Sequence, residues 1–209
     1  MHIQKVYITS HKLIPMNRRQ WYEEHTLRIG KVIARSGLTP NQLTLLSLIP
    51  AVISAYFYYC NREIMGALFL LITLGFDVLD GSVARVLSKK TDFGMVLDAS
   101  IDRYCEFIIL LGIMLGGLAK SWIVFFCFSG MVMASYVRAR IESARTGSKR
   151  VSAMSVGLME RLQKMTLILI GSLLLSIYGN SLNIALFVVG FLSFVTSAQR
   201  LLYGRRELA

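Results

Sequence analysis

Long apolar stretches, each about twenty residues, recur along this sequence and constrain its fold more than any other feature. Only helices and closed barrels satisfy every backbone hydrogen bond inside a bilayer, and a helix needs about 20 residues to cross it. With a mean hydropathy of +0.56 over 209 residues, the chain is too apolar for a soluble domain. The sequence therefore predicts one all-α, polytopic membrane domain.

Six apolar stretches alternate with short loops, so we expect six transmembrane helices. They cover residues 41–60, 64–88, 92–118, 121–144, 158–178 and 181–203. Several carry polar residues in one half, so a hydropathy window undercounts them. The expected organisation is an amino-terminal segment over 1–40, a six-helix domain over 41–203 and a short tail over 204–209.

Residues 17–36 precede the first apolar stretch and mix aromatic and aliphatic side chains with arginine and lysine. This pattern is typical of an amphipathic helix lying on an anionic membrane leaflet. The alternative is an ordinary solvated helix.

The net charge of +11 is distributed unevenly between the two sides of the predicted helices. With six helices and a cytoplasmic amino terminus, the outer loops carry only Arg62 and Lys120, and the other basic residues fall on the inner side. This asymmetry follows the positive-inside rule. It predicts a multi-pass protein of the cytoplasmic membrane with both termini and the residues 77–102 at the cytoplasmic side. Because the charge is confined to one side of apolar helices, nucleic-acid binding is excluded.

Four aspartates stand at helical spacing within this apolar chain. Asp77 and Asp80 are three residues apart, and Asp98 and Asp102 are four apart, so each pair shares one helix face. Two facing helices would bring the four carboxylates together, at a cost of several kcal/mol each unless a cation is bound. Oxygen ligands without nearby His or Cys favour Mg²⁺ or Mn²⁺ over zinc. One or two such ions are therefore expected.

Two other interpretations of the aspartates remain open. They could cap helices or pair with Lys89, Lys90 and Arg103 at the membrane surface. Intramembrane carboxylates also mark ion pathways, which would make the chain a cation-coupled transporter. The depth of the aspartates in the bilayer distinguishes a transporter from the enzyme. A transport site lies near the middle of the bilayer, whereas these aspartates should lie close to its cytoplasmic surface.

The residues around the aspartates form a longer pattern. It runs Asp77-x-x-Asp80-Gly81-x-x-Ala84-Arg85, then eight residues, then Gly94-x-x-x-Asp98-x-x-x-Asp102. The pattern resembles, at every fixed position, the signature of the CDP-alcohol phosphotransferases. The resemblance implies a membrane enzyme that transfers a phosphatidyl-type group from a CDP-linked lipid to an alcohol, releasing CMP. It also implies that the four aspartates are metal ligands, that Asp102 in addition is the catalytic base, and that the enzyme is a homodimer.

Several residues are candidates for binding the CDP-lipid. Gly81 and Gly94 lack side chains beside the aspartates, where either the nucleotide or a neighbouring helix approaches closely. Arg85 can donate two hydrogen bonds to a pyrophosphate, or anchor its helix at the membrane surface. Thr91 is expected to start a helix. The resemblance adds further donor contacts at Asn41, Thr44, Asp80 and Thr91.

The acceptor alcohol is indicated by three helix ends, Ser135–Glu142, Gly157–Arg161 and Ala198–Leu201. They resemble the family branch of phosphatidylinositol-phosphate and archaetidylinositol-phosphate synthases, which implies inositol 1-phosphate as acceptor. Arginines would bind its dianionic phosphate beside the aspartates. The candidates are Arg138, Arg140, Arg161, Arg200 and Lys164.

Two alternatives apply to this acceptor assignment. The basic residues could be simple positive-inside anchors. The branch also usually repeats its Glu-Arg pair, whereas Leu162-Gln163-Lys164 follows Arg161 here, and lysine lacks the planar fork of arginine. Glycerol 3-phosphate, serine or another inositol derivative therefore remain possible acceptors.

Three further features carry weaker predictions. Gly112-x-x-x-Gly116 permits close helix contact, either between two chains or within one. Glu106 extends the stripe of Asp98 and Asp102 by one turn and is a possible partner of the metal ligands. The three cysteines lie in apolar stretches without metal-ligand spacing, so we expect them to be inert packing residues.

Overall fold

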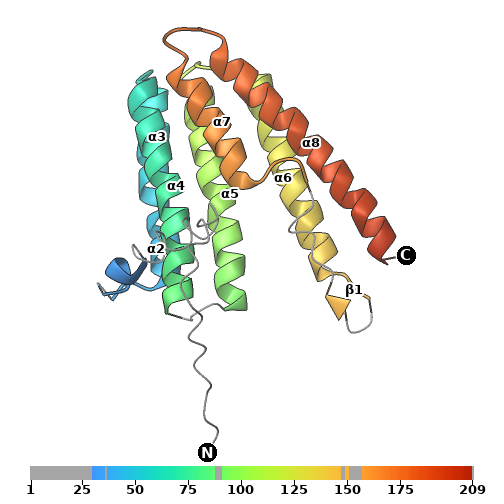
Figure 1. The fold of residues 1–209 in the computed structure, drawn as a ribbon. Helices are drawn as coiled ribbons and strands as arrows, with labels where there is room; N and C mark the ends of the chain where they lie inside the picture. Colours follow the sequence, from blue (N-terminus) through green and yellow to red (C-terminus); the bar gives the residue numbers. More distant parts are fainter. Residues whose placement is uncertain (1–29, 36, 88–90, 147–148, 151–156, 209) are drawn as a thin grey trace, which may run out of the picture.

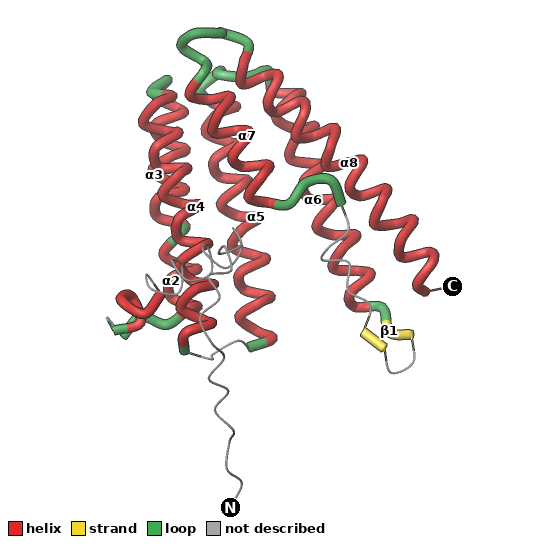
Figure 2. Tube along the Cα trace, in the orientation of Figure 1, coloured by secondary structure: helices red, strands yellow, loops and turns green. Residues whose placement is uncertain are grey.

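The protein is described by a computed structural model covering residues 30–35, 37–87, 91–146, 149–150 and 157–208. These residues form seven complete helices and one short hairpin (Figures 1 and 2). The helices are α2 (Pro40–Leu46), α3 (Leu48–Tyr59), α4 (Glu63–Val86), α5 (Asp92–Leu115), α6 (Ser121–Ser143), α7 (Arg161–Leu173) and α8 (Ser181–Leu208). The hairpin pairs β1 (Arg145–Thr146) with β2 (Lys149–Arg150) in antiparallel register. Apart from this two-residue ribbon, the prediction of an all-α fold is confirmed for the described residues.

Within the described residues, four helical segments are long and apolar enough to cross a membrane. They are Pro40–Tyr59, which joins α2 and α3, and the segments Glu63–Val86, Ser121–Ser143 and Ser181–Glu207. The chain is thus a multi-pass helical membrane protein. Two predicted spans do not meet the same standard: α5 carries five Asp, Glu or Arg residues in 24, and α7 has only 13 residues. The amphipathic helix predicted over 17–36 lies largely outside the described residues. Of this range, residues 30–35 are described, and 30–34 are helical.

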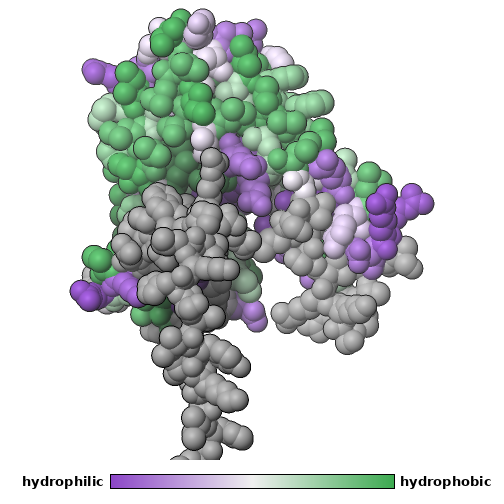
Figure 3. Space-filling model, in the orientation of Figure 1, coloured by the Kyte–Doolittle hydropathy of each residue, from purple (hydrophilic) through white to green (hydrophobic). Residues whose placement is uncertain are grey.

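The helices form two groups that diverge toward one end of the molecule. Helices α3, α4, α5 and α7 lie together, while α6 and α8 run side by side and slant away from α5 (Figure 1). The two helices approach each other closely at Gly130, where a Cβ atom would lie 2.6 Å from the carbonyl oxygen of Gly190. Figure 3 shows a broad apolar band over one half of the molecule, with hydrophilic residues at its edges. This distribution suits a bilayer around the band.

The backbone of α3 packs closely against Gly112 on α5 and against Gly116 at the C-cap of α5 in the same chain. A Cβ atom at Gly112 would lie 2.5 Å from the Cα of Ala55, and one at Gly116 would lie 2.2 Å from the carbonyl oxygen of Tyr58. Only glycine allows two backbones to approach this closely. The pair therefore packs helices within one chain, which is the second of the two alternatives given by the sequence.

Local sequence explains where α2 and α5 begin. Thr39 caps α2, with its Oγ1 accepting from the backbone N of Gln42 and the Gln42 side chain returning the bond, and Pro40 occupies the first turn. Thr91 caps α5 in the same way, accepting a 3.0 Å hydrogen bond from the backbone N of Gly94. The predicted helix start at Thr91 is confirmed.

Candidate active site

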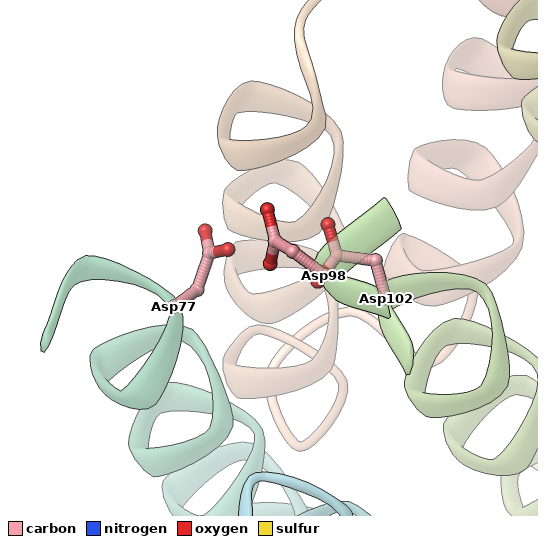
Figure 4. A group of neighbouring side chains, drawn as sticks. All are labelled: Asp77, Asp98 and Asp102. Carbon is pink, nitrogen blue, oxygen red and sulfur yellow. The ribbon is translucent and has the colours of Figure 1, made fainter. Parts of the chain in front are cut away.

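Three of the four aspartates converge between α4 and α5. Asp77 comes from α4, and Asp98 and Asp102 come from successive turns of α5 (Figure 4). One carboxylate oxygen of each lies within 4.8 Å of the others, and all three side chains are partly buried. Helix spacing predicted that four carboxylates would meet if the two helices faced each other, and the structure brings these three together.

Asp80 lies outside that group of three. It is 6% exposed, and its Oδ2 accepts a 2.7 Å hydrogen bond from the Oγ1 of Thr44. This bond ties α2 to α4 one turn away from Asp77. Two predicted site residues, Asp80 and Thr44, thus contact each other directly, while the metal-ligand role of Asp80 stays a prediction.

Arg161, at the start of α7, places a cation among the aspartates. Its Nη1 lies 2.7 Å from Asp77 Oδ1 and 2.8 Å from Asp102 Oδ1. Its own side chain is 15% exposed, so these ion pairs are shielded from water. Arg161 was expected to bind the acceptor phosphate, and the structure shows it in contact with two predicted metal ligands.

Glu106 and Arg103 extend the charged cluster along α5. The Glu106 side chain is fully buried, its Oε1 accepts a 2.6 Å hydrogen bond from Arg103 Nη2, and it lies 3.4 Å from Arg161 Nε. Arg103 also donates to the hydroxyl of Ser135 on α6. The one-turn stripe of acids predicted the position of Glu106. For Arg103, the sequence predicted at most an ion pair with the aspartates. Spacing along one helix does not determine which carboxylate an arginine contacts, so its ion pair with Glu106 was missed.

Asn41, Thr91 and Gly94 come together where α2 and α5 begin. A Cβ atom on Gly94 would lie 3.0 Å from Thr91 Oγ1 and 3.2 Å from Asn41 Oδ1. Three residues predicted to contact the donor lipid, from segments fifty residues apart in sequence, therefore share one place in the fold.

Gly81 faces open space instead of a neighbouring helix. A Cβ atom added there would meet no described atom within 4 Å, which removes tight helix packing as its explanation. Arg85 is exposed one turn further on, and its Nε donates a 3.1 Å hydrogen bond to the Gly81 carbonyl. Room for a ligand beside the α4 aspartates thus remains.

The other candidates for acceptor binding are spread over three helices. Lys164 is buried on α7 and interacts electrostatically with Glu106. Arg200 is buried on α8, donates a 2.7 Å hydrogen bond from Nη1 to the Ala134 carbonyl, and repels Arg138. On α6, Arg138 forms an ion pair of 3.0 Å with Glu142, and Arg140 is exposed.

Comparison with known sequences decides the family. Residues 37–197, most of the chain, match the CDP-alcohol phosphatidyltransferases. The chain belongs to this family. It is therefore a transferase, as the signature around the aspartates predicted, and the transporter interpretation is set aside.

Named relatives of this phosphatidyltransferase cover nearly its whole length. Archaetidylinositol phosphate synthase of Pyrococcus horikoshii is 35% identical over 87% of this chain and 91% of that protein. Phosphatidylinositol phosphate synthase of Mycobacteroides abscessus is 28% identical over 88% of this chain and 84% of that protein. The crystal structure of Mycobacterium tuberculosis phosphatidylinositol phosphate synthase with CDP-DAG bound matches with a TM-score of 0.72 at 26% identity, covering 87% and 94% of the two chains.

The aspartate cluster of this phosphatidyltransferase fits a divalent ion. Asp98 Oδ1 is buried and has no hydrogen-bond partner among the described residues, as expected of an oxygen that coordinates a cation. The three oxygens come from carboxylates only, which hard ions such as Mg²⁺ and Mn²⁺ prefer. A second structure of the M. tuberculosis synthase, with a TM-score of 0.72, contains manganese and citrate. Together these observations support divalent-metal binding.

Proposed function

We propose that this phosphatidyltransferase transfers the phosphatidyl-type group of a CDP-linked lipid to inositol 1-phosphate and releases CMP. The observation that carries this proposal is the convergence of Asp77, Asp98 and Asp102 within 4.8 Å, with Arg161 beside them. The names of the archaeal and mycobacterial relatives support the acceptor, and the CDP-DAG in the M. tuberculosis structure supports the donor. Both ester and ether lipids are compatible with it.

Asp77, Asp98 and Asp102, joined by Asp80, would hold two divalent ions, Mg²⁺ or Mn²⁺. A bound pair of ions would neutralise the phosphates of the donor and of the departing CMP. Asp102, as the base, would take the proton of the attacking inositol hydroxyl onto its carboxylate. The CDP group would be oriented by residues at the starts of α2 and α5 and near the end of α4. They are Asn41, Thr44, Thr91, Gly94, Gly81 and Arg85.

The acceptor phosphate needs positive charge beside these carboxylates. Arg103 and Arg161 contact the buried carboxylate of Glu106, and Lys164 interacts with it electrostatically, so three cations lie close to the aspartates. These cations would attract a dianion and offset its repulsion by the aspartates. We assign the phosphate of inositol 1-phosphate to this region, with Arg200, Arg138 and Arg140 contributing from α8 and α6.

We further propose that α5 and α7 also cross the bilayer, which gives six spans over 41–203 and cytoplasmic termini. The carboxyl end of α8, with Arg205 and Arg206, lies at the same end of the bundle as the end of α4 and the start of α5 (Figure 1). Positive charge collects on the cytoplasmic side of membrane proteins. This arrangement puts the aspartates near the cytoplasmic surface of the cell membrane, where CMP leaves. A homodimer remains part of the proposal.

A direct comparison of acceptors tests the proposed function. Purified protein is given CDP-DAG or CDP-archaeol with inositol 1-phosphate, inositol, glycerol 3-phosphate or serine, and CMP release is measured. We expect inositol 1-phosphate to react at least about 100-fold faster than inositol, because an acceptor without a phosphate loses the attraction to the site's cations. CMP release with glycerol 3-phosphate and none with inositol 1-phosphate would overturn the acceptor assignment.

The Gly81→Ala variant should distinguish an effect on CDP-lipid binding from an effect on folding stability. The added methyl group meets no described atom, and alanine is favoured in a helix by about 1 kcal/mol, so the melting temperature in detergent should hold or rise. If CDP occupies the open space, KM for the CDP-lipid should rise about tenfold or more. Gly75→Ala on the same helix, also in open space, is the matched control and should leave KM unchanged. Equal KM values for both variants would contradict nucleotide binding at Gly81.

A further inference from the structure

Arg161 contacts two carboxylates that a metal ion would also need. Its Nη1 contacts Asp77 Oδ1 at 2.7 Å and Asp102 Oδ1 at 2.8 Å. Both residues belong to the group of three whose carboxylate oxygens lie within 4.8 Å. A guanidinium and a divalent ion this close would repel each other strongly. The two cations therefore compete for the same carboxylates.

Glu106 offers Arg161 a second anionic partner. Its Oε1 lies 3.4 Å from Arg161 Nε, and the side chain is fully buried, so water screens the attraction little. Its other oxygen, Oε2, is buried and has no hydrogen-bond partner among the described residues. Arg161 Nε likewise lacks a well-formed hydrogen bond there. A guanidinium displaced from the aspartates thus has an acceptor within a short shift.

We propose that Arg161 and Glu106 together set the divalent-ion affinity of the aspartate cluster. Arg161 balances the charge of Asp77 and Asp102 while no ion is bound, and it transfers to Glu106 when an ion binds. Glu106 is then a positioning residue, although it lies outside the family signature. This inference rests on the metal dependence in the proposed function but not on the identity of the acceptor alcohol.

The two residues should have opposite effects on metal binding. Arg161→Gln removes the competing cation, so a divalent ion meets unpaired carboxylates and binds more tightly. Glu106→Gln removes the acceptor of the displaced guanidinium and raises the local positive charge, so the ion binds more weakly. We expect a change of about tenfold or more in each direction. The double variant restores the charge balance and should return to within about threefold of the wild type.

The test is titration of full-length protein in detergent with Mn²⁺ alone, following free Mn²⁺ by electron paramagnetic resonance. Neither CDP-lipid nor acceptor is present, so the result does not depend on turnover. Arg62→Gln and Glu63→Gln are matched controls, because they make the same charge changes at the start of α4, about four turns from Asp77. Their Mn²⁺ affinities should stay within about twofold of the wild type.

Two conservative variants keep the test decisive if a glutamine variant does not fold. Arg161→Lys keeps the positive charge but loses the planar guanidinium that contacts both aspartates. Mn²⁺ should therefore bind more tightly than in the wild type, but by a smaller factor than in Arg161→Gln. Glu106→Asp keeps the charge and should retain more affinity than Glu106→Gln. Weaker binding in both Arg161 variants, or unchanged binding throughout, would overturn the inference. Wild-type protein that binds no Mn²⁺ would overturn it together with the proposed metal dependence, whereas a different acceptor alcohol would leave it intact.

Discussion

Asp102→Asn should lower the rate of CMP release about a thousandfold while the protein still folds and binds CDP-lipid. The amide has the shape of the carboxylate but cannot take the acceptor's proton, and it is a poor ligand for a hard cation. Asp102 is also one of the three carboxylates that meet within 4.8 Å. The measurement is the initial rate at saturating donor and acceptor, with the Kd for CDP-lipid determined separately.

Two further substitutions define what this result means. Asp92→Asn changes an exposed acid in the first turn of α5, outside the cluster, and should leave the rate within about twofold. Asp77→Asn should impair CDP-lipid binding more than Asp102→Asn does, because Asp77 is assigned only as a ligand. Near-normal turnover by Asp102→Asn would show that another group removes the proton.

Removal of divalent ions should abolish the activity of this phosphatidyltransferase. Without a cation, three carboxylates beside a pyrophosphate repel the donor, and the lost stabilisation of several kcal/mol corresponds to a rate loss of about a thousandfold or more. Dialysis against a chelator, followed by Mg²⁺ or Mn²⁺, should take CMP release to background and back.

Ion binding also has a readout without substrate. Mn²⁺ should raise the melting temperature of the wild type in detergent, since an ion that binds only the folded state stabilises it. Asp98→Asn should lose this effect, because its buried Oδ1 has no hydrogen-bond partner among the described residues. Full turnover in the presence of a chelator would contradict the metal site.

Much of the candidate site could be predicted because helix geometry is local. The spacing of Asp98 and Asp102 fixes one face of α5, and Thr91 is a favourable residue to begin that helix. The hydrogen bond between Thr44 and Asp80 could not be predicted in this way. It depends on how α2 docks against α4, thirty-six residues further along the chain. The choice of partner for Gly112 and Gly116 likewise depends on tertiary packing.

The membrane spans were predicted less completely than the site. Length and hydropathy support four of the six, since α5 contains the acids and α7 ends at Leu173. The same residues that make the site lower the apolarity of the helices that carry it. In the six-span arrangement proposed here, length and hydropathy miss α5 because of its charged residues and α7 because of its length, whereas α4 meets both criteria although it carries Asp77 and Asp80.

The close seating of α5 against α3 through Gly112 and Gly116 bears on biogenesis. In the six-span arrangement proposed here, α5 carries acidic and basic groups whose transfer to lipid is unfavourable, by up to about 2.5–3.5 kcal/mol each for a group at the bilayer centre. Left alone in lipid, this segment would partition poorly. We expect the translocon to release α5 into the lipid only together with α3 and α4, which are synthesised earlier and lie in apolar candidate spans.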